Sequence, residues 1–441
     1  MALRRKFYDR LIEWKSTHQQ ECLLIKGARQ IGKTYIVEKF GREQYRSFFE
    51  FNFLLDPDAV SIFDGSLKAE DLYAKISAYD ASKRLIPGET LIFLDEIQEC
   101  PNARTALKAF ALDGRYDVIA SGSLLGIKYR SKKLRERSEP KSIAVGYERQ
   151  VTMHSLDFEE FLWAKGILPE AVKVLRGYFD RREMVEAALN NRYDALLREY
   201  LLVGGMPAVV NAYLAAGDFG PVQEEQEKIL AAYVDDIHKY AEKVDVPKIE
   251  GCYQAIPRIL AKDNRKFKFS EVEKNGSERK YGESVEWLKD AALAPMARNV
   301  ILPEIPLAAN VREGWFKLYI SDIGLLSAMY GLETKKLIFS KKLKGSAKGG
   351  IYENFLAGVL QRKGYPLYYY KTTDGSREVE FVLEKDGGVV PLEMKSTNGA
   401  TVSLNETLVL KDVPYGYKFV DGNVGVSGKK ITLPHYMAMF L

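Results

Sequence analysis

The sequence GARQIGKT, at residues 27–34, decides the fold of the N-terminal part of the chain. It has the pattern G-x-x-x-x-G-K-T of a phosphate-binding loop, or P-loop. Residues 22–25 before it are apolar, as in a buried parallel strand, and residues 35–40 after it can continue as a helix. The alternative is a glycine-rich turn that matches the pattern by chance, but such a turn would not be expected to lie between an apolar strand and a helix. The sequence therefore predicts an α/β fold with a parallel sheet of the P-loop NTPase type.

The predicted loop binds a nucleoside triphosphate through its backbone and two side chains. Glycines let backbone N–H groups turn toward a phosphate, and the N-terminus of the following helix adds a partial positive charge. Lys33 is expected to reach the outer phosphates, and the Thr34 hydroxyl is expected to bind Mg2+. We therefore expect ATP and Mg2+ as cofactors. The predicted nucleotide contacts are Gly27, Ala28, Arg29, Gln30, Ile31, Gly32, Lys33 and Thr34.

Residues 91–96 read LIFLDE, an apolar run that ends in two acids. On a buried strand these acids emerge at the carboxyl end of the sheet, where open α/β sheets bind their ligands. Asp95 is expected to hold Mg2+ through water. Glu96 is expected to orient or deprotonate the attacking water. Lys33 and Glu96 are thus the catalytic candidates of this site.

Residues 116–123 read YDVIASGS and predict another buried strand that ends in small hydroxyl residues. Ser121 or Ser123 could sense the terminal phosphate, and Ser123 is counted among the nucleotide-binding candidates. The alternative is that these residues only form a turn, because serine and glycine after a strand are typical of turns.

The composition predicts a multidomain protein without a membrane segment. With 441 residues, of which 46% are hydrophobic, two or three domains are expected. No apolar run approaches the roughly eighteen residues that span a bilayer, and charges interrupt the apolar positions of residues 1–14. We therefore expect a cytoplasmic protein. The three cysteines and four histidines indicate neither a disulfide framework nor a zinc site.

The net charge of +5 is too small to indicate a nucleic-acid partner by itself. Two local stretches, residues 128–141 and 335–348, are rich in lysine and arginine and could contact phosphates. The alternative is that they are ordinary solvated loops.

Helical patterns dominate from residue 154 to about residue 240, and the segment LLVGGMP at residues 201–207 interrupts them. Residues 267–293 have the spacing of a helix-turn-helix with a break at residues 275–277. Arg279 and Lys280 would then lie near the start of a helix that contacts DNA. The alternative is a small winged-helix unit that packs against the rest and binds no DNA.

A second candidate site lies in the last third of the chain. Glu353 falls in an amphipathic helix at residues 350–363, and strands are predicted at residues 378–383 and 389–395. Residues two apart on a strand share a face, so Glu380, Glu393 and Lys395 can point to one side. The glutamates could hold Mg2+, and Lys395 could stabilise developing charge during cleavage of a phosphodiester. A hairpin with polar outward residues would produce the same spacing.

Several motifs together resemble a bacterial and archaeal family of AAA-type ATP-binding proteins of the switch-like P-loop branch. They are GARQIGKT, LIFLDEIQ, MHSLDFEEFL, LVGGMP, LYISDIGLL, YENF, EVEFVL and PLEMKS. The family's C-terminal domain of unknown function is similar to the restriction-endonuclease core. The resemblance implies nucleotide roles for Gly32, Lys33, Thr34, Asp95 and Glu96. It implies nuclease-like positions for Glu353, Glu380, Glu393 and Lys395, with Glu353, Glu380 and Glu393 as metal ligands and Glu380, Glu393 and Lys395 as catalytic residues.

Two positions depart from the family pattern. The second nuclease acid is usually an aspartate, whereas this chain has Glu380. Relatives often have Gly-Arg after the basic insert, whereas here Gly146 is followed by Tyr147, Glu148 and then Arg149. Arg149 is therefore only a candidate for the arginine that stabilises charge.

These observations predict three domains: an AAA-type P-loop ATPase domain at residues 1–165, a helical and winged-helix domain at 166–305, and an α/β restriction-endonuclease-like domain at 306–441. The leading hypothesis is a slow ATPase whose cycle repositions the other two domains, with DNA as a candidate partner. The alternatives are a Mg2+-dependent nuclease regulated by ATP and a nucleotide-bound scaffold without turnover. A protein partner or a homo-oligomer is also compatible with the sequence.

Overall fold

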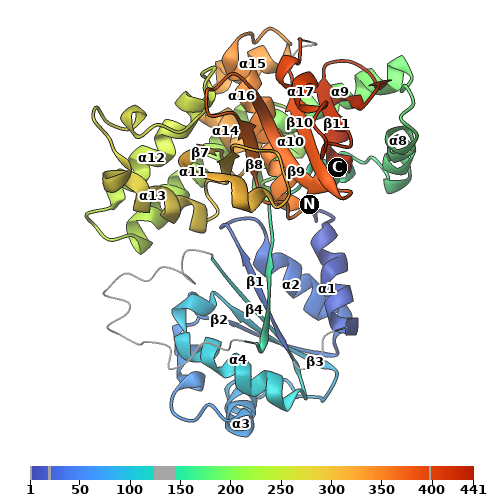
Figure 1. The fold of residues 1–441 in the computed structure, drawn as a ribbon. Coiled ribbons are helices and arrows are strands. Elements are labelled where there is room, and N and C mark those ends of the chain that lie inside the picture. The colour runs from blue at the N-terminus through green and yellow to red at the C-terminus, as the bar shows by residue number, and fades with distance from the viewer. Residues whose placement is uncertain (1, 18–20, 124–145, 397–398) are drawn as a thin grey trace.

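The computed structural model describes residues 2–17, 21–123, 146–396 and 399–441 (Figure 1). The N-terminal α/β unit lies below in this view, and the helical and C-terminal parts lie together above it. The basic stretch at residues 128–141 lies outside the described residues. Within the described part of the chain, no helix is both long and apolar enough to cross a membrane. The cytoplasmic localisation stays a prediction.

The N-terminal sheet has five strands in the order β2-β3-β4-β1-β5, and all neighbours in it pair in parallel. This confirms the predicted parallel α/β sheet. The strands are β1 (Cys22–Gly27), β2 (Ser47–Asn52), β3 (Thr90–Asp95), β4 (Asp117–Ser123) and β5 (Glu148–Thr152). The helices of this unit are α1 (Lys6–Thr17), α2 (Lys33–Gln44), α3 (Ala69–Tyr79) and α4 (Pro101–Asp113).

The sheet is buried on both faces because successive residues of its strands enter different cores. On β3, Ile92 and Leu94 pack into a core built with α3 and α4. Leu91 and Phe93 pack on the opposite face, in a core that also contains residues of the helical region and of the C-terminal end of the chain. The N-terminal unit is therefore joined to the rest of the protein by a continuous apolar core.

Helices follow the N-terminal sheet. The first of them begins with a capping box, in which the Asp157 side chain accepts the N–H of Glu160 and the Glu160 side chain accepts the N–H of Asp157. The helices are α7 (Phe158–Ala164), α8 (Pro169–Arg181), α9 (Ala187–Val203), α10 (Pro207–Ala216), α11 (Phe219–Tyr240), α12 (Val246–Leu260) and α13 (Glu278–Asp290). The predicted interruption at residues 201–207 separates α9 from α10.

The predicted helix-turn-helix forms only its second helix. α13 begins after the expected break, but the residues before the break form a single 3-10 turn, η3 (Phe269–Glu271). The backbone N–H of Phe267 donates to the carbonyl oxygen of Phe316 at 2.9 Å, which ties this segment to a strand in an extended conformation. α13 packs instead against the long helix α12. The winged-helix prediction is therefore not confirmed.

The C-terminal sheet has eight strands in the order β12-β13-β11-β10-β9-β8-β6-β7. β6 pairs antiparallel with β7, so this sheet begins before residue 306, where the predicted C-terminal domain starts. The strands are β6 (Met296–Val300), β7 (Val311–Leu318), β8 (Tyr368–Lys371), β9 (Glu378–Lys385), β10 (Gly388–Met394), β11 (Gly416–Val420), β12 (Gly425–Ser427) and β13 (Lys430–Pro434). The helices are α14 (Ile323–Met329), α15 (Leu332–Phe339), α16 (Ser346–Arg362) and α17 (Val402–Thr407).

The second basic stretch, residues 335–348, is not simply a solvated loop. Its first residues belong to α15, and Lys335 is buried and donates a hydrogen bond to Oε1 of Gln226 on α11. Burial lowers the pKa of Lys335 to about 8. This lysine therefore contributes to helix packing and is not exposed for phosphate binding.

Candidate nucleotide-binding site

The phosphate-binding loop connects β1 to α2, as predicted. Gly32 has φ of 89°, a left-handed conformation that is strained for residues with a Cβ atom. Gly27 lies so close to neighbouring backbone that a Cβ atom would stand 2.5 Å from the carbonyl oxygen of Met153. Both glycines are therefore needed for the shape of the loop, which leads directly into the N-terminus of α2 at Lys33.

Lys33 lies across the loop and is buried. Its Nζ donates to the carbonyl oxygens of Gly27 at 3.1 Å and Ala28 at 2.9 Å. Burial lowers the pKa of Lys33, although the charges of Glu96 and Asp95 partly oppose this effect. The loop thus holds a cation whose present partners are two neutral carbonyl groups, which phosphate oxygens could replace.

Asp95 is the most densely hydrogen-bonded acid of the site. The hydroxyl of Thr34 donates to its Oδ2 at 2.8 Å, and Nδ2 of Asn52 donates to the same oxygen at 2.9 Å. The hydroxyl of Ser121 donates to Oδ1. Thr34 and Asp95 therefore place two hard oxygen donors side by side at the end of the loop, a donor set that fits Mg2+.

Asn52 is a further residue of the site, and it was not among the residues predicted from the sequence. It ends β2 and lies opposite Asp95 in the parallel register of β2 and β3. The residues SFFEFN alternate as a half-buried strand, so the polar residue at the carboxyl end was a usable signal. Of the two serines considered as phosphate sensors, Ser121 contacts Asp95, whereas Ser123 lies beside Gly27 in the register of β1 and β4.

Glu96 follows β3 in a left-handed conformation, with φ of 53°. Non-glycine residues rarely adopt this conformation, and it is enriched at functional sites. Nε2 of Gln98 donates to Oε2 of Glu96. The charge of Glu96 acts on the pKa of Lys33, so the Glu96 carboxylate lies within electrostatic reach of the loop lysine.

Arg149, the candidate for the charge-stabilising arginine, lies on the edge strand β5. It forms an ion pair with Glu21 and is in register with Leu23 of β1. Arg149 therefore pairs with an acid at the start of β1, whereas the phosphate-binding loop follows the other end of that strand.

Arg29 links the phosphate-binding loop to the helical region. Its Nε lies 2.9 Å from Oδ2 of Asp236, and its Nη2 donates to the hydroxyl of Tyr240 at 3.1 Å. The hydroxyl of Tyr233 lies 3.4 Å from the Arg29 carbonyl oxygen. All three partners belong to the C-terminal half of α11. One helix therefore contacts both the side chain and the backbone of a loop residue.

A further contact joins α11 to the segment that follows Asp95 and Glu96. Nζ of Lys239 lies 3.0 Å from Oε1 of Glu99. Burial raises the pKa of Asp236 to about 6, although Arg29 and Lys239 act in the opposite direction. The Arg29–Asp236 ion pair is therefore formed at neutral pH and weakens as the pH falls through this value.

In the C-terminal domain, Glu353 on α16 is fully buried and is bonded to residues from other segments. Its Oε1 accepts Nζ of Lys317 at 2.9 Å and the hydroxyl of Tyr319 at 2.8 Å. Its Oε2 accepts Nη1 of Arg265 at 2.6 Å. Burial alone would raise the pKa of Glu353, but Lys317 and Arg265 lower it overall. Glu353 is thus an ionised carboxylate already neutralised by two cations.

The other acids of this candidate site face each other across two strands. Glu380 and Glu393 lie one position beyond the Phe381–Leu392 pair of β9 and β10, and Glu393 is paired with Lys395. Oε2 of Glu380 accepts the backbone N–H of Met394 at 2.6 Å. Burial raises the pKa of Glu380 well above its ordinary value, and the charges of Glu393 and Glu353 raise it further. Burial also raises the pKa of Glu393.

These three glutamates are not arranged as a metal site. Among the described residues, no group of three or more histidine, cysteine, aspartate or glutamate residues could hold a metal ion. The reason is visible at Glu353, because both of its oxygens are already hydrogen-bonded to Lys317, Tyr319 and Arg265. The predicted metal set of Glu353, Glu380 and Glu393 therefore does not fit Mg2+ as it stands.

Comparison with protein families divides the chain into three matched segments. Residues 19–162 match the family of an AAA domain. Residues 194–336 match a domain of unknown function (DUF8612), and residues 348–435 match another domain of unknown function (DUF4143). The N-terminal part of the chain is therefore an AAA-type, ATP-binding P-loop domain. The restriction-endonuclease-like assignment of the C-terminal part is not confirmed.

Comparison with curated proteins gave no match. Solved structures similar to this chain include a Walker-type ATPase of Pyrococcus abyssi, with 15% identity, 75% of this chain and 96% of that chain covered, and a TM-score of 0.44. The Aeropyrum pernix ORC1 protein in complex with DNA has 12% identity, coverage of 78% and 95%, and a TM-score of 0.28. AMPPCP-bound DnaA from Aquifex aeolicus has 12% identity, coverage of 65% and 86%, and a TM-score of 0.27.

Proposed function

We propose that the chain is a Mg2+-dependent ATPase that works as a switch, in which the nucleotide state changes how α11 is held against the ATPase domain. The observation that carries the proposal is the pairing of Arg29, inside the phosphate-binding loop, with Asp236 and Tyr240 on α11. Phosphate binding that moves the loop backbone also moves Arg29. The nucleotide thereby has a direct route to the helical region.

Each residue of the site has a distinct chemical role in this proposal. The loop N–H groups and Lys33 bind the phosphates, and Lys33 exchanges its carbonyl partners for phosphate oxygens. Thr34 and Asp95 would hold Mg2+, which neutralises phosphate charge when bound. Asn52 and Ser121 fix the Asp95 carboxylate through hydrogen bonds. Glu96 orients the attacking water and accepts its proton.

Replacing Asp236 with Asn is expected to weaken the coupling without abolishing ATP binding. The amide has the same size but lacks the charge that pairs with Arg29. In the wild type, ATP with Mg2+ should change the rate at which a protease cleaves the helical region. In Asp236→Asn this change should shrink by at least about threefold, which corresponds to roughly 0.7 kcal/mol of lost coupling.

The matched control is Asp235→Asn, because Asp235 is the adjacent and exposed residue of the same helix. Its protease pattern should respond to ATP as the wild type does. Because the pKa of Asp236 is about 6, the wild-type response should also fade as the pH is lowered below that value, whereas Asp236→Asn should show no such step. An ATP response that is equal in wild type and Asp236→Asn at neutral pH would refute the coupling.

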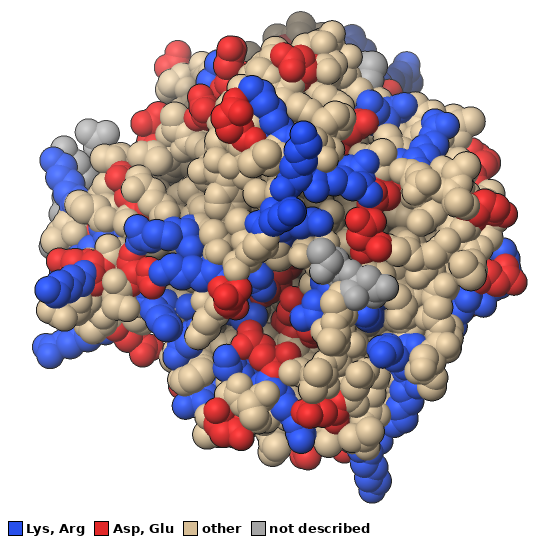
Figure 2. Space-filling model, turned by 90° about the horizontal axis from the view of Figure 1, so that it is seen from above, with Lys and Arg blue, Asp and Glu red and all other residues tan. Residues whose placement is uncertain are grey.

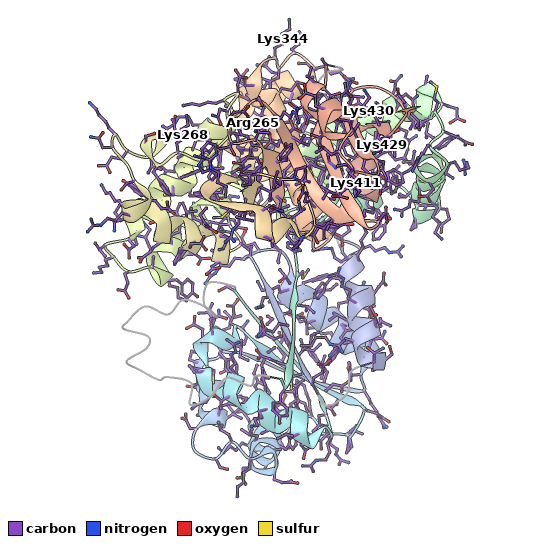
Figure 3. All side chains as sticks on the ribbon, in the orientation of Figure 1. Arg265, Lys268, Lys344, Lys411, Lys429 and Lys430 are labelled. Atoms are coloured by element: carbon purple, nitrogen blue, oxygen red, sulfur yellow. The ribbon has the colours of Figure 1, made fainter. Side chains whose placement is uncertain are left out.

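A second candidate function is the Mg2+-dependent nuclease predicted from the C-terminal acids. One observation favours it: Lys and Arg side chains border a hollow that contains acidic side chains on the face seen in Figure 2. Figure 3 labels Lys268 on one side of the upper part of the molecule and Lys411, Lys429 and Lys430 on the other. Such a distribution of cations suits a polyanion. Glu353 is not part of this candidate, because both of its oxygens are already hydrogen-bonded. Metal binding by Glu380 and Glu393 alone would first have to displace the protons favoured by the raised pKa values of these two acids.

The nuclease candidate is tested by incubating plasmid and linear DNA with Mg2+ or Mn2+. Replacing Lys395 with Ala removes the ion pair to Glu393 and should lower the cleavage rate by about 100-fold, as expected when one charge-stabilising group is lost. Lys228→Ala, which removes an exposed ion pair with Glu225 on α11, is the matched control and should leave cleavage unchanged. Cleavage that is unchanged in Lys395→Ala would assign the activity to another site or to a contaminant.

A further inference from the structure

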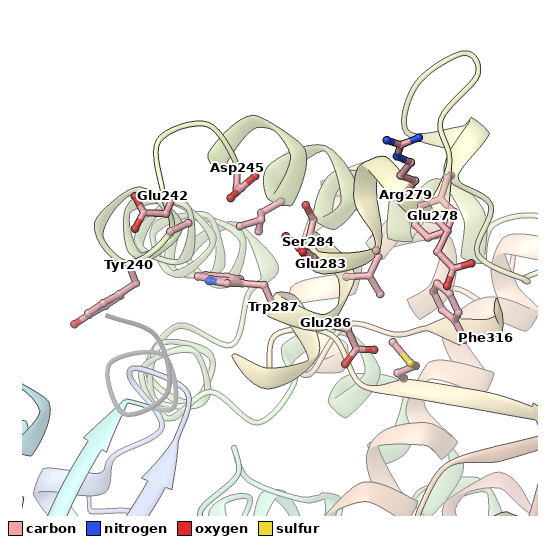
Figure 4. Close-up of a pocket in the computed structure, with 16 residues that line it drawn as sticks. Tyr240, Glu242, Asp245, Glu278, Arg279, Glu283, Ser284, Glu286, Trp287 and Phe316 are labelled. Atoms are coloured by element: carbon pink, nitrogen blue, oxygen red, sulfur yellow. The ribbon is translucent and has the colours of Figure 1, made fainter. Parts of the chain in front are cut away.

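A pocket with a volume of about 730 Å3 lies where α11 ends, beside α12 and α13 (Figure 4). Its apolar lining comes from separate elements of the helical region and the C-terminal sheet. A volume of this size accommodates a small ligand or a few side chains of a peptide. The apolar lining residues are Ala241, Ile249, Phe269, Val285, Trp287, Met296 and Phe316.

Carboxylates surround this apolar lining. Glu242 and Asp245 come from the segment between α11 and α12, and Glu278, Glu283 and Glu286 come from α13. Among the described lining residues, Arg279 carries the one positive charge. Lys248 pairs with Asp245 and Lys289 pairs with Glu286, but neither lysine lines the pocket. The pocket therefore has a negative potential over an apolar interior.

The charge of α13 disfavours DNA at this place. Lys280, one of the two residues expected to contact DNA, is paired with Glu273, and Glu278, Glu283 and Glu286 on the same helix would repel phosphates. A lysine- or arginine-rich peptide has the complementary charge, and an apolar side chain between its basic residues could enter the pocket. We propose that this pocket binds a cationic peptide segment of a partner protein, anchored by an apolar side chain.

One wall of the pocket also contacts the phosphate-binding loop. Tyr240 lines the pocket, and its hydroxyl accepts the hydrogen bond from Arg29. A peptide that packs against Tyr240 therefore acts on the same helix end that holds the loop. The peptide binding itself is independent of the proposed switch function, but its effect on the nucleotide rests on that function.

Binding is measured by fluorescence anisotropy with a short, fluorescein-labelled peptide of repeating sequence Lys-Leu-Lys-Trp and the full chain without nucleotide. Glu283→Gln combined with Glu286→Gln should weaken binding about tenfold. Both side chains are exposed, so the fold should be retained. Glu170→Gln combined with Glu224→Gln changes the net charge equally at exposed positions on α8 and α11 and should leave binding unchanged.

A charge exchange gives an independent measurement. A peptide with glutamate in place of each lysine should bind the Glu283→Lys plus Glu286→Lys variant better than the wild type. Equal binding of the lysine peptide to wild type and to the Gln variant would overturn the proposal. Displacement of the peptide by spermine at an equal concentration of positive charge would overturn the proposal as well. So would a DNA duplex that binds more tightly than the peptide and loses its binding in the Glu283→Gln plus Glu286→Gln variant.

The effect on the nucleotide is measured as the ATP affinity with and without bound peptide. The peptide should change ATP affinity by about threefold or more, and ATP should change peptide affinity by the same factor because coupling is reciprocal. Tyr240→Phe, which removes the hydroxyl that accepts from Arg29, should reduce this factor toward one while the peptide still binds. Peptide binding without any such factor would refute the coupling and leave the binding site standing.

Discussion

Replacing Glu96 with Gln should lower the rate of ATP hydrolysis by about 100- to 10,000-fold, the range that general acid–base groups contribute. Glutamine has nearly the size of glutamate and can still accept the hydrogen bond from Gln98, but it cannot take a proton from water. The left-handed backbone at Glu96 should persist, because the substitution leaves the main chain unchanged. ATP affinity, measured by calorimetry, should therefore stay close to that of the wild type. Phosphate release, measured in a single turnover, should be largely lost.

Lys33→Ala is the control that separates binding from chemistry. It removes the buried ammonium group that now donates to two carbonyl oxygens of the loop and that would donate to the phosphates of ATP. ATP affinity should therefore fall by about 10- to 100-fold, which corresponds to about 1.5–3 kcal/mol for a hydrogen bond to a charged group. Wild-type turnover in Glu96→Gln would remove Glu96 from the mechanism. Phosphate release at background in both the wild type and Glu96→Gln would refute ATPase activity altogether.

The strands, loop and helix of the candidate nucleotide site could be predicted because their signals are local in the sequence. GARQIGKT lies between a strand and a helix, and LIFLDE is a buried strand that ends in two acids. The carboxyl ends of parallel strands meet at one edge of the sheet, so Asp95 reaches Thr34. Asn52 was missed because its relation to Asp95 depends on the strand order, which places β2 beside β3.

The contacts that connect the domains could not be predicted in this way. Arg29 and Tyr240 are 211 positions apart, and nothing in either local pattern relates them. The alternation of strand residues did predict a common side for Glu380, Glu393 and Lys395, but no periodicity indicates which partners a buried carboxylate will find. The predicted helix-turn-helix was not confirmed, and here too a contact distant in the sequence takes part, because the backbone N–H of Phe267 donates to the carbonyl oxygen of Phe316.

Replacing Glu353 with Ala should lower the free energy of unfolding by about 3–5 kcal/mol, the usual effect of breaking a buried ion pair. The substitution leaves two buried cations with too little compensating charge, because Lys317 keeps one carboxylate, Glu378, and Arg265 keeps only the carbonyl oxygens of Leu260 and Ser346. Because the pKa of Glu353 is lowered, its stabilising contribution is present at neutral pH and is lost only as the pH falls through that lowered value. Urea unfolding at neutral pH measures the effect.

Glu406→Ala is the matched control, since Glu406 forms a partly exposed ion pair with Arg377 at 2.7 Å and should contribute less than about 1 kcal/mol. The sign of the change at Glu353 also separates two roles. Carboxylates assembled to bind a metal repel one another when the metal is removed, so deleting one of them would stabilise the metal-free chain. Glu353 does raise the pKa of Glu380, but its own oxygens are bonded to Lys317, Tyr319 and Arg265. The attraction is therefore expected to exceed the repulsion, and a metal-free Glu353→Ala variant as stable as the wild type, or more stable, would contradict this account.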